Sequence, residues 1–439
     1  MQKKTYNNSV AYLSMYSFGA ILILFAFIFD TPLEIGEGFL LILTSPSNLI
    51  TDYFEIGGIG ASFLNSGLIL ILSAFSLHLN RIKLKGEAVA GLVTVCGFAL
   101  FGKNLYNSIP IAAGTYLYAY VMKLPPHEVA IPGLFATALG PLVSTLSFGL
   151  GLGLYRGLAI GCAAGLIIGF IIIPLAKSFF NFHRGFNLYN IGFTAGIIGM
   201  FAAGILRMFN LKIESVSIIS QGNNLPLSII LLFVFLFFLL LGLHRNNYSF
   251  KGYSKLLKQT GRLKSDFIES CGLGVTLINI SLMGFIGWLY VMLIGGQLNG
   301  ASLGAIFTLM GFSAYGNHPK NTLPIFAGAF LASILNIHEP NSTLSVIATI
   351  FGSTLAPIAG YFGLISGIIA GFAHVSMSLN VSYLHGGMNL YNNGFSGAFI
   401  AATLVPLFET FGKRKNGIKE DSARPYLSPL SHYNLRNIK

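Results

Sequence analysis

Long apolar runs that carry almost no charge recur along the chain and leave it few ways to fold. The run 226–243, PLSIILLFVFLFFLLLGL, contains no charged residue. A helix needs roughly 20 such residues to cross the hydrocarbon core of a bilayer. Only 9% of the 439 residues are charged, against about 25% in soluble proteins, so the chain cannot cover a water-facing surface of normal size. The sequence therefore predicts an all-α polytopic membrane protein.

The apolar runs are numerous, and several are too short to cross a bilayer on their own. We predict about 12–14 helical segments, because some runs are interrupted by Gly or Pro and are typical of half-helices. The run 38–50, with Pro46 inside it, is a further candidate for a re-entrant segment. The predicted spans are 10–29, 56–79, 88–102, 105–122, 130–148, 152–176, 183–206, 226–243, 270–294, 302–316, 322–336, 343–360, 363–382 and 386–407.

Basic residues are concentrated in short stretches between the apolar runs. Most of the 26 Lys and Arg lie in residues 1–9, 80–87, 244–264 and 411–439. Such clusters mark cytoplasmic loops and favour contact with anionic lipid rather than with nucleic acid. Alternating spans place all four stretches, and therefore both termini, in the cytoplasm. We expect a multi-pass protein of the cell membrane with lipid as a partner and no nucleic-acid partner.

A duplication, with an offset of 214 residues in its first two matching stretches, divides the chain into two halves. One short match is TALGPL (137–142) with STLAPI (353–358), which aligns Pro141 with Pro357. Because the matches keep their order, chance is a poor explanation. The matching stretches are EIGGIGASFLNSGLI (55–69) with ESCGLGVTLINISLM (269–283), GFALFGKNLYNSIPIAAG (97–114) with GFSAYGNHPKNTLPIFAG (311–328), and HRGFNLYNIGF (183–193) with HGGMNLYNNGF (385–395).

The repeat also predicts domain boundaries and the relation of the halves. We expect a first membrane repeat at 1–207, a linker span with a basic cytoplasmic loop at 208–264, a second repeat at 265–410, and a polar cytoplasmic tail at 411–439. Seven predicted crossings separate equivalent points, and an odd number inverts the second half. Inverted repeats with broken helices are the architecture of many transporters.

Asparagines within the repeated motifs are the first candidates for a solute path. Amides offer both donors and acceptors, and they are costly in lipid unless they are satisfied. The structural alternative is helix–helix hydrogen bonding beside glycines, which is slightly favoured for any single Asn. Asn187 and Asn190 are three residues apart, so they would share one helical face. The predicted path residues are Asn187, Asn190, Asn389, Asn392, Asn65, Asn279, Asn107 and Asn321.

Carboxylates and histidines are candidates for ion or proton coupling. Glu55 and Glu269 each precede a glycine-rich turn, where an intramembrane carboxylate could bind a cation. Capping of a helix N-terminus is the favoured alternative for both. His183 and His385 open the NLYN motifs and could relay protons, or could be histidines with a satisfied hydrogen bond.

Four prolines are predicted to break helices, and no residue pattern predicts an enzyme. Pro141, Pro357, Pro110 and Pro324 would free backbone carbonyls toward the path. We find no nucleophile–base pattern, no phosphate loop and no metal-ligand spacing. The sequence therefore predicts no catalytic residue, no metal and no cofactor.

The NLYNxGF signature at 187–193 and 389–395 resembles that of an uncharacterised bacterial family of multi-pass membrane proteins, a domain of unknown function. The resemblance covers most of residues 10–410 and implies no particular substrate. A more distant resemblance is to urea transporters, through LGPL (139–142) and LAPI (355–358). The Thr and Phe of the urea-transporter motif are absent here, which argues against urea as the substrate.

Transport of a small polar solute between the two repeats is the function that the sequence favours. The first alternative is a cation- or proton-coupled transporter that uses Glu55 and Glu269. An intramembrane enzyme is the least supported alternative, because no catalytic cluster is found. The sequence leaves a homo-oligomer open and does not give the solute's identity.

We expect a cysteine introduced at position 255 to resist a membrane-impermeant maleimide applied to intact cells. Lys255 lies in the stretch 244–264, whose six basic residues and lack of acidic residues predict a cytoplasmic loop. The three native cysteines are first replaced by serine, and labelling after permeabilisation is the control. Strong labelling of intact cells would contradict the predicted topology.

Overall fold

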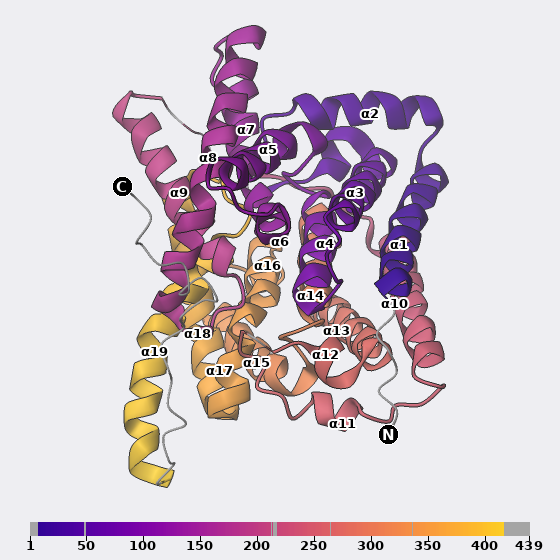
Figure 1. Cartoon of the computed structure of the whole chain (residues 1–439), viewed down its shortest axis with the longest axis vertical. Coiled ribbons are helices and arrows are strands. Elements are labelled where there is room, and N and C mark those ends of the chain that lie inside the picture. Colours follow the sequence, from indigo (N-terminus) through magenta and orange to yellow (C-terminus); the bar gives the residue numbers. More distant parts are fainter. Residues whose placement is uncertain are drawn as a thin grey trace.

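The computed structural model describes residues 8–47, 50–211, 213, 217–263, 265–335 and 337–416. These residues are predominantly helical (Figure 1), and their sheet content is a two-residue parallel pair, β1 (Ile50–Thr51) with β2 (Ser217–Ile218). The all-α prediction is confirmed. The predicted tail lies mostly outside the described residues.

Ten helices among the described residues are long and apolar enough to cross a membrane. The chain is therefore a multi-pass membrane protein, as predicted. Two of the ten, residues 127–149 and 343–362, are interrupted inside and are the most buried of the set. The ten are Asn8–Phe29, Tyr53–Leu79, His127–Gly149, Leu154–His183, Asn190–Met208, Asn224–Arg245, Leu273–Leu293, Thr343–Phe362, Leu364–His385 and Asn392–Phe411.

The helices form two repeats, which occupy the upper and lower parts of Figure 1. The first comprises α1 (Asn8–Phe29), α2 (Pro32–Thr44), α3 (Tyr53–Leu79), α4 (Gly86–Phe98), α5 (Leu105–Val121), α6 (His127–Ala136), η1 (Thr137–Leu139), α7 (Gly140–Ser144), η2 (Thr145–Gly149), α8 (Leu154–His183) and α9 (Asn190–Met208). The second comprises α10 (Asn224–Arg245), α11 (Tyr253–Leu256), α12 (Phe267–Cys271), α13 (Leu273–Leu293), α14 (Gly300–Phe312), α15 (Pro319–Leu335), α16 (Thr343–Phe351), η3 (Gly352–Leu355), α17 (Ala356–Phe362), α18 (Leu364–Val381), η4 (Ser382–His385) and α19 (Asn392–Asn416).

The offset of 214 residues that the motifs show is kept by the helix boundaries. It relates α3 to α12 and α13, α4 to α14, and α5 to α15. Gly58 kinks α3 with φ 86°, and Gly272 separates α12 from α13 with φ 91°. Glycine is the residue that adopts this region without steric cost, so both repeats place one at the kink. The long helix α8 has the shorter α18 as its counterpart, which changes the offset beyond it.

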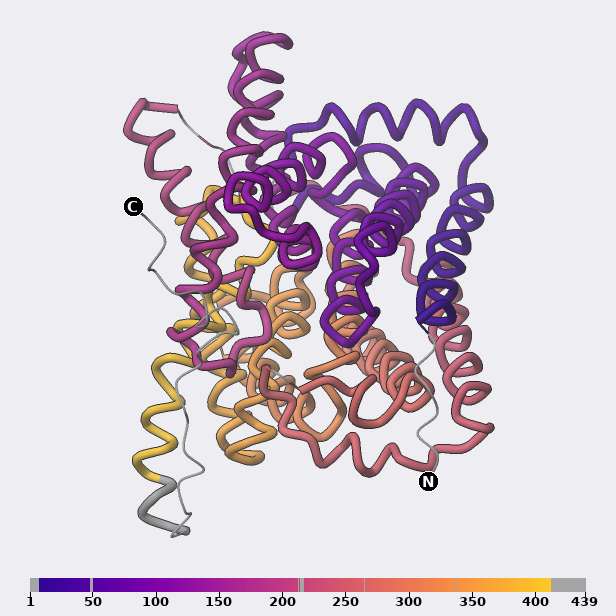
Figure 2. Tube along the Cα trace, viewed as in Figure 1, coloured from indigo at the N-terminus to yellow at the C-terminus, as the bar shows by residue number. Residues whose placement is uncertain are grey.

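Helices α4 and α14 cross at the centre of the molecule (Figure 2). A Cβ on Gly97 would lie 2.7 Å from the Gly304 carbonyl oxygen, and a Cβ on Gly311 would lie 2.9 Å from the Ala90 carbonyl oxygen. The early part of each helix therefore meets the late part of the other, so the pair is antiparallel. A two-fold axis between them is perpendicular to both, which is the relation that inverted repeats require.

Six aromatic rings surround this axis in symmetric pairs. Phe98 lies 6.1 Å from Phe351, and the equivalent Phe312 lies 5.8 Å from Phe135, between ring centroids. Tyr391 lies 4.7 Å from Phe98, and Tyr189 lies 4.4 Å from Phe312. The two tyrosine rings meet each other at 5.2 Å. These fully packed rings form the core that joins the repeats.

Two carboxylates also join the repeats at helix N-termini. Asp52 caps α3 through the Phe54 N–H at 2.9 Å and accepts from the Gly300 N–H of α14 at 3.0 Å. Asp266, at the equivalent position, caps α12 and accepts from the Gly86 N–H of α4 at 2.9 Å. Each repeat thus caps the central helix of the other, where orphan N–H groups attract negative charge.

Several boundaries differ from the sequence prediction. The segment expected to re-enter at 38–50 is α2, which begins at Pro32 because Thr31 and Glu34 form a capping box before it. The span predicted at 183–206 begins at Asn190, since α8 continues to His183. The predicted linker 208–264 contains α10, which is the counterpart of α1.

We expect Gly97→Val to destabilise the protein by about 3 kcal/mol, because the new side chain would overlap the α14 backbone. Gly36→Val is the matched control, since a Cβ on this α2 glycine has nothing within 4 Å. Chemical unfolding of both variants in mixed micelles measures the difference. Equal stability would show that α4 and α14 do not cross at these glycines.

Candidate functional site

Each repeat contains two interrupted helices whose breaks lie side by side. In the first repeat the turn 99–104 separates α4 from α5, and η1 separates α6 from α7. The second repeat has the turn 313–318 and η3 at the equivalent places. Because no water reaches the interior of a bilayer to satisfy such turns, each polar group there needs a protein or solute partner.

The four predicted helix-breaking prolines divide into two classes. Pro141 and Pro357 lie in the first turn of α7 and α17, directly after the 3-10 turns at the breaks. Pro110 and Pro324 differ from the prediction, because α5 and α15 continue through them. Their rings pack on glycines of the neighbouring helices α8 and α18, and this packing holds the helices together where one hydrogen bond is missing.

Asn65 and Asn279 hold the ends of the central helices. The Asn65 amide nitrogen donates to the carbonyls of Ala99 at 2.7 Å and Lys103 at 2.9 Å. The Asn279 amide nitrogen donates to the equivalent carbonyls, those of Ser313 and Asn317, each at 2.8 Å. Both side chains therefore satisfy backbone carbonyls left free by the break, which is a structural role.

Asn107 and Asn321 cap the helices that follow these turns. The Asn107 carboxamide oxygen accepts from the Asn104 N–H at 2.9 Å, and Asn104 accepts in return from the Asn107 N–H. Asn321 accepts from the His318 N–H at 2.9 Å. These pairs fix the start of α5 and α15, so their polar atoms are largely used within the protein.

The NLYN motifs cross between the repeats. The Leu188 N–H donates to the Thr354 carbonyl at 3.0 Å, and the Leu390 N–H donates to the Ala138 carbonyl at 3.2 Å. Each motif therefore pairs with the η-turn of the opposite repeat. Asn187 also accepts from the Thr354 hydroxyl and donates to the Gly394 carbonyl at 3.0 Å. Asn187 precedes α9, so the prediction that it shares a helical face with Asn190 is wrong.

Asn190 and Asn392 each tie the start of a helix to the preceding one. Asn190 donates to the Ala176 carbonyl at 3.3 Å, and its oxygen lies 2.9 Å from His183 Nε2. Asn392 donates to the equivalent carbonyl, that of Ser378, at 3.0 Å. His385 occupies the place of His183 in the second repeat and is buried. These contacts agree with the structural alternative, in which the asparagines join neighbouring helices by hydrogen bonds.

The two NLYN motifs meet at the two-fold axis. A Cβ on Gly192 would lie 2.8 Å from Tyr391 Cβ, and a Cβ on Gly394 would lie 2.9 Å from Tyr189 Cβ. The glycines that follow the motifs therefore allow the two chains to approach each other. The two tyrosine rings fill the space between the motifs at this point.

Lys103 is the site residue that the sequence analysis missed. Its side chain is 2% exposed, and its ammonium donates to the Thr137 hydroxyl, between the two helix breaks of the first repeat. Asn389 lies beside the same break, because the N–H of the next residue, Leu390, donates to the Ala138 carbonyl. The side-chain amide nitrogen of Asn389 is buried without a partner. We name Asn65, Lys103, Thr137 and Asn389 the lysine cluster.

The second repeat has a neutral counterpart, the amide cluster of Asn187, Asn279, Asn317 and Ser353. Asn317 replaces Lys103 at the offset of 214, and both polar atoms of its buried carboxamide lack a partner. The alignment of 97–114 with 311–328 already contains this pair, which sets a lysine against an asparagine within apolar surroundings.

Glu55 and Glu269 do not lie in either cluster. Glu55 is exposed in the first turn of α3. Glu269 forms an ion pair with Lys85, in which the two side chains are 58% and 49% exposed. The hydrogen bond to Glu269 raises the pKa of the Lys85 ammonium. Both carboxylates lie at the surface of the structure, and the carboxylates that cap helices in the interior are Asp52 and Asp266 instead.

Each cluster is covered by a segment of its own repeat. Asn104, next to Lys103, donates to the Ile42 carbonyl at the end of α2 at 2.9 Å. His318, next to Asn317, bonds the Gln259 carbonyl at 2.9 Å through Nε2. A surface cavity of about 450 Å³ lies outside this second cover. Its lining includes Lys258, Gln259, His318, Lys320, Asn321 and Pro324.

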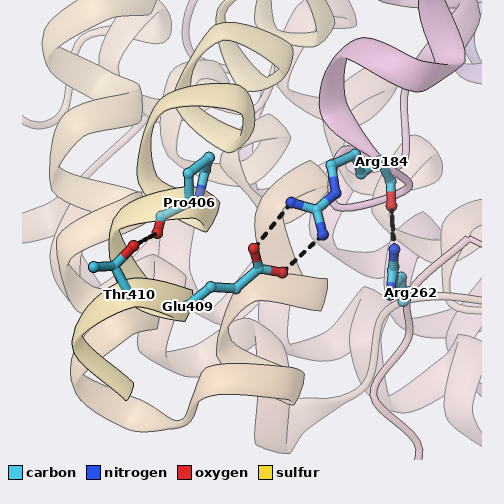
Figure 3. Close-up of polar contacts among 5 residues, drawn as sticks. All are labelled: Arg184, Arg262, Pro406, Glu409 and Thr410. Atoms are coloured by element: carbon cyan, nitrogen blue, oxygen red, sulfur yellow. Dashed lines mark hydrogen bonds and ion pairs between the residues drawn. The ribbon is translucent and has the colours of Figure 1, made fainter. Parts of the chain in front are cut away.

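The loop that contains Gln259 and covers the amide cluster is held in place by contacts of two arginines (Figure 3). Arg262 donates from Nε and Nη2 to the Arg184 carbonyl at 3.0 and 2.8 Å, and its guanidinium stacks over Phe186 at 4.4 Å. Arg184 forms a two-pronged ion pair with Glu409 of α19, at 2.8 and 3.0 Å. The loop before α12 is thereby joined to the first NLYN motif and to the last helix.

A family model described as "Protein of unknown function (DUF1576)" matches the chain twice, over residues 31–208 and 245–410. The two matches cover most of the chain and coincide with the two repeats. No curated protein and no solved structure gives a significant match.

We expect Asn187→Ala to destabilise the protein by about 1.7 kcal/mol and the equivalent Asn389→Ala by about 0.6 kcal/mol, the upper and mean values for such bonds in membranes. Asn187 bonds Thr354 and Gly394, whereas the Asn389 nitrogen has no partner. Unfolding of both variants in mixed micelles measures the difference. Equal losses of unfolding free energy would show that the two asparagines contribute equally to stability.

Proposed function

Because the chain belongs to the family described as "Protein of unknown function (DUF1576)", whose description gives no activity, we propose a function from the site alone. The protein is a membrane transporter or channel for a small polar solute. The path runs between the two repeats and passes the lysine cluster and the amide cluster. Transport, rather than catalysis, is proposed, since no nucleophile–base arrangement accompanies these residues.

The single observation that carries the proposal is the unpaired carboxamide of Asn317. A buried amide without a hydrogen bond costs roughly 1–3 kcal/mol. Both polar atoms of Asn317 are buried and unpaired, while the Asn279 side chain beside it is used on backbone carbonyls. A polar solute that passes this point would supply both a donor and an acceptor.

The architecture supports the same proposal. Antiparallel repeats with interrupted helices place polar turns from both halves at one interface. The cavity of about 450 Å³ is lined by His318 and Asn321, and His318 is the residue after Asn317 of the amide cluster. A coupled mechanism through Glu55 and Glu269 has less support, because both carboxylates lie at the surface and outside the two clusters.

We further propose that loops 80–85 and 246–266 face the cytoplasm, together with both termini of the chain. The ion pair of Lys85 with Glu269 and the bond from the Gly86 N–H to Asp266 support one side for both loops. Their basic residues favour the inner face of the cell membrane.

We expect Asn317→Ala to reduce solute flux at least tenfold in proteoliposomes while the melting temperature holds. The substitution breaks no hydrogen bond within the protein, because neither side-chain atom has a partner. Uptake is first screened with small amides, amines, anions and cations. Asn380→Ala, at an exposed position of α18, is the matched control. Wild-type flux in Asn317→Ala would remove the amide cluster from the path.

A further inference from the structure

We infer that the lysine cluster binds a small monovalent anion, such as chloride or a short carboxylate, with the Lys103 ammonium as its countercharge. The inference rests on the proposed function, because it assigns a charge to one part of the same path. It also distinguishes the two repeats, since the amide cluster offers no charge.

The hydrogen bonds of Lys103 leave its charge unbalanced. The Thr137 hydroxyl donates to the Leu134 carbonyl, so its oxygen accepts from the ammonium. An ammonium has three N–H donors, and two remain. The ion pairs in the part of the chain described are Lys85 with Glu269 and Arg184 with Glu409, neither of which involves Lys103. A buried ammonium keeps its charge with a partner of opposite sign and becomes neutral without one.

Beside the two remaining N–H groups of the ammonium, the cluster has one unpaired donor and one unpaired acceptor. The Asn389 oxygen accepts from the Tyr391 N–H at 3.0 Å, which leaves the Asn389 nitrogen as the unpaired atom. The equivalent Asn187 accepts from the Thr354 hydroxyl at the break of the second repeat, but Ala138 offers no hydroxyl to Asn389. The Asn65 oxygen is the unpaired acceptor of the cluster. An ammonium with an amide N–H recognises an anion better than a neutral or cationic solute.

The amide cluster shows what the same fold does without the charge. Asn317 takes the place of Lys103, and its unpaired atoms are one donor group and one acceptor. The fold therefore accommodates asparagine at this position. This makes Lys103→Asn a substitution that the backbone can accept, and it removes the charge at the first cluster.

The test compares melting temperatures of the purified full-length protein in detergent. Potassium chloride or potassium acetate is set against potassium gluconate, whose anion is bulky, at the same ionic strength. We expect chloride or acetate to raise the wild-type melting temperature by about 2 °C or more through binding to the folded state. Lys103→Met and Lys103→Asn should lose this difference. Lys123→Asn, which removes an exposed ammonium, should keep it.

A wild-type melting temperature that is the same in all three salts would overturn the inference. An equal rise in Lys103→Met would do so as well, because the effect would then be a general one of salt. If Lys103→Met does not fold, Lys103→Asn and the wild-type comparison decide. Flux measurements separate the two proposals: a Lys103-dependent shift without any solute flux supports the anion site and contradicts the transport function.

Discussion

The backbone groups at an interrupted helix inside a bilayer must be paired by the protein, because lipid offers no hydrogen bonds. In this protein each repeat supplies the partners that the other lacks. Leu188 and Leu390 bond the η-turns across the interface, and Asp52 and Asp266 cap the central helices across it. Asn65 and Asn279 satisfy part of each break from within its own repeat, and the opposite repeat supplies the remaining partners named here.

The duplication allowed much of this architecture to be predicted, because equivalent residues take equivalent roles. Gly58 and Gly272 mark the same kink, and the boundaries of α3, α4 and α5 recur in the second repeat. The sequence prediction named Glu55 and Glu269 as the candidate carboxylates, but these two are not the interior ones. Three residues upstream at the same offset, Asp52 and Asp266 form the caps.

The roles of the asparagines could not be predicted, because they depend on partners far away in the sequence. The Asn65 amide donates hydrogen bonds to carbonyls of the turn after α4, and the Asn187 amide donates to a carbonyl of the opposite repeat. An amide in a repeated motif has the same local sequence in either case. The spacing of Asn187 and Asn190 suggested one helical face, but a loop precedes α9 because Leu188 is paired across the interface. Only the tertiary contacts distinguish an amide that is hydrogen-bonded within the protein from one that has no partner.

The positions where the repeats differ are therefore the informative ones. Groups that hold the fold keep their identity in both halves, as Asn65 does with Asn279. The fold tolerates either lysine or asparagine at the position of Lys103 and Asn317, so this position is not needed for the two-fold relation. Inversion turns the equivalent clusters toward opposite faces of the membrane. Identical clusters would treat a solute alike from both sides, and a charge in one of them removes that equivalence.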